Sequence, residues 1–401
     1  MTNIALCWEF GDNTGHLHRL GKLASAGYRR GWQMAVITKA LNGSRAYFPN
    51  GTPLFQAPVP AHQIDPGRRL NYSDILAHNG YGEVGSLHKR VRAWRNLNHR
   101  IRPDLILADH APTALLAARI DGIPAASLGS GFLIPPDESP LPPFDWVTPP
   151  PRTALKRVER AVLATVNQVL SEAGAQPLER LSDLLAPEER FLLTHPRLDH
   201  YPRRPAHEEY WGLLTSSRQQ PDQLWPPGEG PRVLGYLRTE QKGFEPLLRA
   251  LGGMRVRGLI HAPDCPEELA RTLSTPQLRL TREPLNLDRL ADECDLGVGY
   301  GSPGFVTDLL LAGKPLLLAP IHMEQAMLSR RLFDQSCAEM APPHWKEGDY
   351  VEALTRLIEE PEWTREAEDL GRALRGGPDT ATVLERVADR CEGLIRKGPR
   401  T

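Results

Sequence analysis

A chain of 401 residues is too long for one ordinary hydrophobic core and predicts two domains of roughly 200 residues each. Its 48 Lys and Arg residues nearly balance its 49 Asp and Glu residues, so it lacks the overall positive field that attracts nucleic acid or an anionic membrane surface. The charge balance therefore favours a small or neutral partner over a polyanion.

Cysteine usage and hydropathy indicate the compartment. The cysteines are odd in number and scattered, with no Cys-x-x-Cys spacing, which is typical of reduced thiols rather than of a zinc or disulfide site. The apolar run at residues 4–7 is short, and no segment reaches the ~20 apolar residues of a membrane span. We therefore expect a cytoplasmic protein without an integral membrane segment, while contact with a membrane surface stays open. The cysteines are Cys7, Cys265, Cys294, Cys337 and Cys391.

The first half of the chain alternates short strand-like runs with amphipathic helical runs. This is the pattern of a parallel sheet covered by helices. Leucines at helical spacing follow the first run, and Gly31 is placed to end that helix. The expected strands are residues 4–8, 34–38, 104–108 and 125–128, and the expected helices include residues 17–28 and 113–120.

Two proline-rich stretches interrupt the alternation. Residues 133–151 carry too many prolines for a helix or a central strand and predict an extended loop, either a lid or a rigid surface connection. Residues 219–231 precede a new strand at 232–237 and predict the linker between domains.

The second half restarts the alternation and ends in a mainly helical tail. Expected strands are residues 256–260, 296–299 and 316–319, and expected helices are 244–251, 266–273 and 305–312. We assign residues 1–215 to the N-terminal domain, 216–231 to the linker, and 232–401 to the C-terminal domain with its helical tail. The alternative for the end of this tail is a C-terminal helix that crosses back to the first domain.

The turn after the first strand carries a candidate base. Gly11 and Gly15 permit close backbone approach, and the helix that begins there offers free N–H groups to an anion or a developing oxyanion. His16 at the start of this helix could remove a proton. The alternative is a surface or capping histidine, which is the commoner role at a helix start.

Asp109 ends the strand predicted at residues 104–108. In open α/β sheets the carboxyl ends of the strands face the ligand crevice, so Asp109 could hold one nitrogen of His16 and leave the other free to act as a base. The alternative is that Asp109 caps the helix beginning near Pro112. The sequence favours neither.

Residues 294–325 form the most specific pattern: a strand, a small-residue turn, a helix, a tight turn, a strand, and a loop with an acid and an amide. The turn after the strand would let a diphosphate approach backbone N–H groups at a helix N-terminus. Asp308 could accept hydrogen bonds from a ribose, and Glu324 with Gln325 could bind sugar hydroxyls. Each piece also has an ordinary structural role, but the ordered set is harder to explain in that way and indicates a nucleotide site. The candidate donor-binding turn residues are Tyr300, Gly301, Ser302 and Gly304.

In order and spacing these motifs resemble the donor-binding signature of family 1 glycosyltransferases, the group of UDP-glycosyltransferases and macrolide glycosyltransferases. There His-Gly-Gly, a ribose-binding acid, Gly-Val-Pro and Asp-Gln follow one another. Residues 284–290 resemble the segment that packs the nucleobase. The matching places are held by Gly301, Asp308, Gly313, Pro315, Glu324 and Gln325.

The resemblance extends over almost the whole chain. Gly15-His16 resembles the family's Gly-His, whose histidine is the general base, and Asp109 ends a strand like the one that supplies its partner acid. The resemblance implies the GT-B fold, in which two Rossmann-like, doubly wound parallel-sheet domains face each other across a cleft.

The donor motif departs from the family at three places. Tyr300 stands where the family has a diphosphate-binding histidine, Ser302 replaces the second glycine, and Phe305 replaces a small hydroxyl residue. Arg238 and Lys242 could supply the missing positive charge, as basic residues of this turn do in other GT-B enzymes. Alternatively, they belong to an ordinary solvated helix start.

The resemblance implies an inverting, metal-independent, hexosyltransferase-like enzyme. It would move a sugar from a nucleotide diphosphate donor to an acceptor nucleophile on a small molecule, with no cofactor beyond the nucleotide sugar. Two alternatives stay open: a nucleotide-sugar hydrolase or epimerase, and a catalytically silent GT-B-like binding or regulatory protein. Tyr72, Trp146 and the prolines of residues 133–151 could wall an acceptor pocket or serve only packing. The sugar, the nucleotide and the acceptor are left open.

Overall fold

The computed structural model describes residues 2–12, 14–60, 69–215 and 223–398. The chain forms two compact units: Met1–Leu214 together with Asp379–Thr401, and Thr215–Pro378. The expectation that all of residues 232–401 would belong to the second domain is therefore wrong for the last helix. Residues 216–222 of the assigned linker lie outside the described residues.

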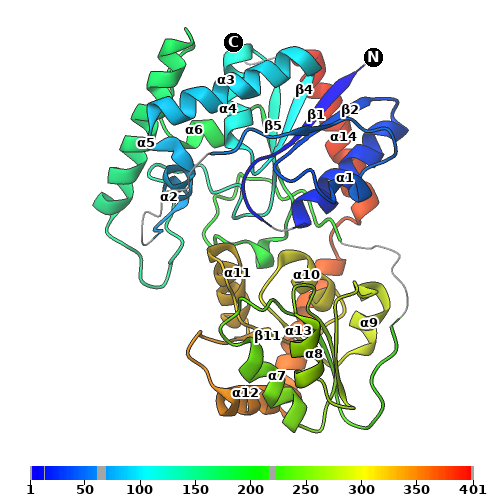
Figure 1. Cartoon of the computed structure of the whole chain (residues 1–401). Helices are drawn as coiled ribbons and strands as arrows, with labels where there is room; N and C mark the ends of the chain where they lie inside the picture. The colour runs from blue at the N-terminus through cyan, green and yellow to red at the C-terminus, as the bar shows by residue number, and fades with distance from the viewer. Residues whose placement is uncertain (1, 13, 61–68, 216–222, 399–401) are drawn as a thin grey trace. The chain divides into compact units, whose positions relative to one another are not determined.

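The first unit is built on a six-stranded parallel sheet (Figure 1). Its strand order is β3-β2-β1-β4-β5-β6, the doubly wound order in which the chain reverses direction across the sheet between β1 and β4. The strands are β1 (Asn3–Trp8), β2 (Gln33–Thr38), β3 (Leu54–Gln56), β4 (Leu105–Asp109), β5 (Ala125–Gly129) and β6 (Glu189–Leu192).

Helices cover both faces of this sheet. They are α1 (Gly15–Arg29), α2 (Tyr72–Leu76), α3 (Val84–Ile101), α4 (Pro112–Asp121), α5 (Arg152–Glu172), α6 (Ser182–Leu185) and α14 (Thr380–Lys397), with short helical turns η1 (Ser44–Tyr47), η2 (Ala77–Tyr81) and η3 (Pro196–Leu198). Gly31, with φ of 74°, follows the end of α1 as the glycine expected there.

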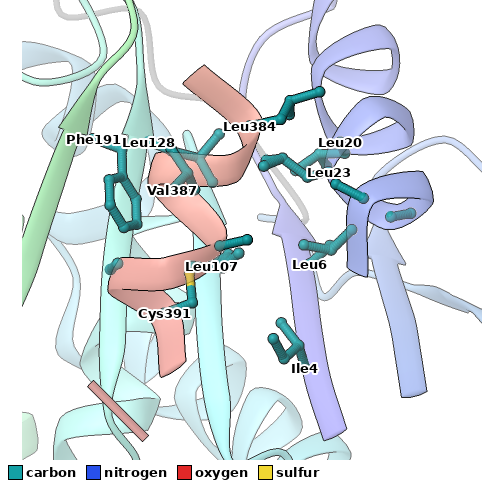
Figure 2. Close-up of a cluster of buried hydrophobic side chains, with 14 of the residues drawn as sticks. Ile4, Leu6, Leu20, Leu23, Leu107, Leu128, Phe191, Leu384, Val387 and Cys391 are labelled. Carbon is teal, nitrogen blue, oxygen red and sulfur yellow. The ribbon is translucent and has the colours of Figure 1, made fainter. Parts of the chain in front are cut away.

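The C-terminal helix α14 completes the core of the first unit. Leu384, Val387 and Cys391 pack against side chains of α1, β1, β4, β5 and β6 (Figure 2). Arg30 at the end of α1 pairs with Glu385 and other acids of α14. The amphipathic pattern of α14 is satisfied by this sheet face, since a helix with one apolar face is stabilised by burying it.

The second unit repeats the same topology. Its parallel sheet has the order β12-β11-β10-β7-β8-β9, so here the reversal lies between β7 and β10. The strands are β7 (Arg232–Tyr236), β8 (Arg257–His261), β9 (Leu278–Thr281), β10 (Leu296–Gly299), β11 (Leu316–Leu318) and β12 (Ala338–Met340). The helices are α7 (Phe244–Gly253), α8 (Glu267–Leu273), α9 (Leu287–Glu293), α10 (Pro303–Leu311), α11 (Met323–Phe333), α12 (Glu347–Glu359) and α13 (Pro361–Arg375).

Three further expectations from the sequence can be compared with the structure. All five cysteines are free and buried, and in the described part of the chain no helix is long and apolar enough to cross a membrane. Residues 133–151 contain neither a helix nor a strand, as expected.

Candidate active site

The first candidate site lies where the strand order of the first sheet reverses. Adjacent parallel strands β1 and β4 end together, with Trp8 opposite Asp109. In doubly wound sheets ligands bind at this position, beyond the carboxyl ends of the strands. The turn that leads from β1 into α1 and the end of β4 are therefore the parts of this unit best placed for chemistry.

His16 and Asp109 meet at this edge. The Nδ1 atom of His16 lies 2.8 Å from Oδ1 of Asp109, and both side chains are buried. Because an ionised carboxylate can only accept, Nδ1 carries the hydrogen and Nε2 keeps its lone pair. The imidazole stacks on Trp8, with ring centroids 5.0 Å apart and an interplanar angle of 17°. The pair thus has the tautomer and the fixed orientation that a general base needs.

The second oxygen of Asp109 binds a residue that the sequence analysis did not single out. Arg19, one turn after His16 on α1, places Nη1 2.6 Å from Oδ2 of Asp109. Burial would raise the pKa of Asp109, but the charge of Arg19 and the contact with His16 hold that pKa below its ordinary value. Asp109 is therefore a carboxylate shared by two α1 side chains.

The capping alternative for Asp109 is wrong. Helix α4 has Ala111 at its N-cap, with no side-chain cap. The backbone N–H of Thr113 in its first turn instead donates to Oε2 of Glu9 at 2.9 Å, and the Thr113 hydroxyl donates to Oε1 at 2.6 Å. Buried Arg90 pairs with the same carboxylate at 3.2 Å. Glu9 takes the capping role and leaves Asp109 to His16 and Arg19.

Gly11 is required by the position of His16. Its φ of 84° lies in the left-handed region, and an ideal Cβ built on it would sit 2.9 Å from Nε2 of His16. The free nitrogen of the imidazole therefore faces the Gly11 backbone. Gly15 is the exposed first residue of α1 and continues the turn. His18 packs against Tyr47 and has no part in the site.

His110 is a second imidazole beside His16. Its ring centroid lies 5.9 Å from that of His16 at 24°, and its φ of 51° is in the left-handed region, which is uncommon for a residue with a Cβ. Within the described part of the chain neither ring nitrogen makes a hydrogen bond of good geometry, and burial lowers the pKa of His110 to about 3, an effect that the Phe10 backbone offsets only in part. A histidine following Asp109 carried no pattern that sequence reasoning could use.

Aromatic side chains surround His110. Phe10, Tyr72 and Phe132 have ring centroids 5.6, 5.9 and 6.4 Å from it. Tyr72, expected near an acceptor pocket or in the interior, is 1% exposed and belongs to this aromatic cluster. Trp146 is only half-buried and lies on the proline-rich loop.

The proline-rich loop is tied to the first unit by hydrogen bonds. The side chain of Asn71 donates to the carbonyl of Leu141 at 2.8 Å, and Phe144 donates its N–H to Leu70 at 2.8 Å. Glu159 of α5 accepts from the Leu141 N–H at 2.6 Å and from the Ser139 hydroxyl at 2.7 Å. These bonds favour a fixed connection over a lid.

The second candidate site lies at the corresponding reversal in the second unit. Strands β7 and β10 end side by side, with Gly299 opposite Tyr236. Tyr300 follows β10 and is 4% exposed; its ring packs on Tyr236 with centroids 5.0 Å apart. Burial, together with Tyr236, raises the pKa of Tyr300, so its phenol is a neutral hydrogen-bonding group.

The expected donor-binding turn leads into α10. Gly301 has φ of 83°, and a Cβ there would lie 2.8 Å from Oγ of Ser329 on α11, so the turn fits closely against that helix. Ser302 is the N-cap of α10 and Gly304 is exposed in its first turn. Asp308 is half-buried and lies in the second turn of α10, so it is not a first-turn acid that interacts with the helix N-terminus.

Two buried glutamines connect the loops around this turn. Gln325 Oε1 accepts from the N–H groups of Ile321 and His322 at 2.9 and 3.1 Å, which occupies its carbonyl oxygen. Gln241 accepts from the Arg238 N–H at 2.7 Å and donates to the Ala319 carbonyl at 3.0 Å. Gln241 was missed because an isolated glutamine in a polar segment has no distinctive pattern.

The other predicted donor residues differ in their surroundings. Burial lowers the pKa of Arg238, but Tyr236 and Tyr300 more than offset it, so the net pKa is raised and the half-buried guanidinium lies beside Tyr300. Lys242 is exposed and Glu324 is half-buried. The structure thus brings Arg238 to the Tyr300 turn and His16 to Asp109. Within the described ranges, no group of three or more His, Cys, Asp or Glu side chains could hold a metal ion.

Comparison with known proteins identifies the fold. No protein-family model matches the chain, and no curated protein matches it in sequence. Solved structures match over nearly full length. The glycosyltransferase VinC in complex with DTDP has a TM-score of 0.70 at 15% identity, covering 99% of this chain and 100% of VinC. The spinosyn rhamnosyltransferase SpnG complexed with spinosyn aglycone has a TM-score of 0.68 at 14% identity, covering 97% and 100%.

A third match is the Streptomyces sp. SF2575 glycosyltransferase SsfS6, complexed with thymidine diphosphate, with a TM-score of 0.62 at 16% identity, covering 97% of this chain and 100% of that one. The two doubly wound sheets and these matches give the chain the GT-B glycosyltransferase fold. The fold predicted from the sequence is thereby confirmed.

Proposed function

We propose that the protein is an inverting, metal-independent glycosyltransferase that moves a sugar from a nucleoside diphosphate to a hydroxyl or similar nucleophile on a small molecule. The observation that carries this proposal is the buried His16–Asp109 pair at the strand-order reversal of a GT-B chain. The five free cysteines support a location in the reducing cytoplasm.

In the proposed reaction His16 Nε2 takes the proton of the acceptor hydroxyl. The acceptor oxygen forms a bond to the anomeric carbon while the bond from that carbon to the diphosphate oxygen breaks, and attack from the opposite face inverts the configuration. Asp109 keeps the imidazole in the right tautomer and stabilises its protonated form. Base assistance of this kind contributes roughly 10²–10⁴ in rate.

The second unit would hold the donor. The N-terminus of α10, from Gly301 to Gly304, offers N–H groups to the diphosphate. Arg238 and the neutral Tyr300 phenol beside it would supply positive charge and a hydrogen bond where the family uses a histidine. Asp308 would bind the ribose, Glu324 the sugar hydroxyls, and Gln325 only through its amide N–H groups, because its oxygen is occupied.

The solved structures support the substrate classes. VinC is described with DTDP, SsfS6 with thymidine diphosphate, and SpnG with spinosyn aglycone. A thymidine or uridine diphosphate sugar and a natural-product-like acceptor are therefore the first substrates to test.

The decisive experiment follows donor consumption and product mass together. The protein is incubated with UDP-sugars and dTDP-sugars, with and without a metabolite extract, and with and without a chelator. Acceptor-dependent transfer that survives the chelator supports the proposal, and the anomeric coupling constant of the product tests inversion. Donor loss without any acceptor would indicate a hydrolase, and absence of turnover would indicate a binding protein.

A further inference from the structure

The carboxylate that orients His16 is also bound by a cation. Asp109 is fully buried, and its two oxygens are divided between His16, at 2.8 Å, and Arg19, at 2.6 Å. Residues three apart on a helix lie on the same face, so α1 presents both side chains to one acid. The Arg19 side chain is 17% exposed, so water screens its charge only in part.

This arrangement changes the charge balance of the pair. With Arg19 present, Asp109 and a neutral His16 form a cluster of zero net charge, and protonating His16 makes it positive. Without Arg19, the unprotonated cluster would be a buried anion, which burial disfavours, and protonating His16 would neutralise it. The cation therefore favours the unprotonated imidazole that a base must have.

From this geometry we infer that Arg19 is a positioning residue of the base. It fixes the Asp109 carboxylate, and its charge keeps His16 unprotonated down to a lower pH than in a His16–Asp109 pair that lacks the cation. The inference rests on the proposed function, because the relevant step is proton removal by His16.

Other charged groups near the pair do not replace Arg19. His110 stacks beside His16 and stays uncharged at neutral pH. Lys39, after β2, pairs with Asp12 in the β1–α1 turn. Glu9, after β1, is paired with Arg90 of α3. In the described residues Arg19 is therefore the cation in direct contact with the Asp109 carboxylate.

Three variants separate charge from hydrogen bonding. Arg19→Gln keeps a donor for Asp109 and removes the charge, and Arg19→Lys keeps the charge. Arg29→Gln removes a positive charge from the exposed end of the same helix, about 15–20 Å along its axis at 1.5 Å per residue. For the wild type and each variant, kcat/KM is measured as a function of pH with the donor and acceptor identified by the screen under Proposed function.

We expect the acid limb of the Arg19→Gln profile to move up by about one pH unit or more, with activity restored at alkaline pH. Arg19→Lys and Arg29→Gln should keep the wild-type midpoint. A uniform loss for Arg19→Gln with an unchanged midpoint would overturn the charge role, and an unchanged profile would overturn the inference entirely.

A measurement without substrates separates this inference from the proposed function. Nitrogen-15 signals of labelled histidine, assigned with His16→Ala, give the titration midpoint of the pair in wild type and Arg19→Gln. An upward shift in Arg19→Gln supports the inference even if no sugar is transferred, in which case only the proposed function fails. Identical midpoints would overturn the inference whatever the enzyme does.

Discussion

Replacing Gly11 with alanine should damage the site through one added carbon. The residue has φ of 84°, and its Cβ would lie 2.9 Å from Nε2 of His16 and 3.4 Å from Nδ1 of His110. The left-handed backbone alone costs a residue with a Cβ about 1–2 kcal/mol of folding stability. The contact with Nε2 is too short to persist, so the imidazole or the turn must move. Because a displacement of about 1 Å can cost 10²-fold in rate, we expect turnover to fall by about one to two orders of magnitude.

Gly31→Ala is the matched control. Gly31 has φ of 74°, and a Cβ there would meet no atom of the described residues within 4 Å. Urea denaturation should show a loss of about 1–2 kcal/mol for Gly31→Ala and at least that much for Gly11→Ala, while kcat should fall only for Gly11→Ala. Equal turnover in the two variants would refute the placement of His16 Nε2 against Gly11.

Three further perturbations test other parts of the account. His110→Phe removes two buried nitrogens that make no hydrogen bond of good geometry with the described residues. Denaturant titrations should show an unfolding free energy that is unchanged or raised by about 1 kcal/mol or more; clear destabilisation would show that the nitrogens are bonded. Gln241→Ala removes the hydrogen bonds that connect the Arg238 loop to Ala319 at the end of β11. Calorimetry should therefore show weaker binding of dTDP or UDP, and unchanged affinity would contradict this expectation. Leu384→Ala on α14 should destabilise the first unit by about 2–5 kcal/mol and speed amide exchange in β1 and β4. The control Leu357→Ala on α12 should destabilise the second unit instead. The reverse pattern would mean that α14 is not part of the first core.

The fold was predictable because its signals are local and repeated. Apolar runs bounded by helical runs fixed β1, β4, β7 and β10, the strands that carry both candidate sites. The edge strands β3, β6, β9 and β12 were missed because each mixes polar and apolar residues and is only partly buried, whereas the equally short β10 and β11 are continuous, fully buried runs of apolar and small residues. The domain bounds placed α14 with the second unit, and only the alternative of a helix crossing back agrees with the structure. The amphipathic pattern of α14 predicts a buried face but not which of two sheets buries it.

Only some residues of the candidate sites could be predicted from the sequence. The meeting of His16 with Asp109 follows from doubly wound topology, since the two strands that end beside these residues must be neighbours. Arg19 was missed although it lies three residues after His16, because an arginine on a helix is usually a solvated surface residue. The capping of α4 by Glu9 and the position of His110 depend on tertiary contacts that no local pattern records.

The most direct test of the central claim is the turnover of His16→Ala, Asp109→Asn and the double variant, with nucleotide affinity measured on the same preparations. We expect His16→Ala to lower kcat by roughly 10²–10⁴ while the Kd for the nucleoside diphosphate stays near wild type. Asp109→Asn should also lower kcat, and the double variant should lose less than the two single losses combined, since the pair acts as one unit. Near-normal turnover of His16→Ala with the native acceptor would contradict the account.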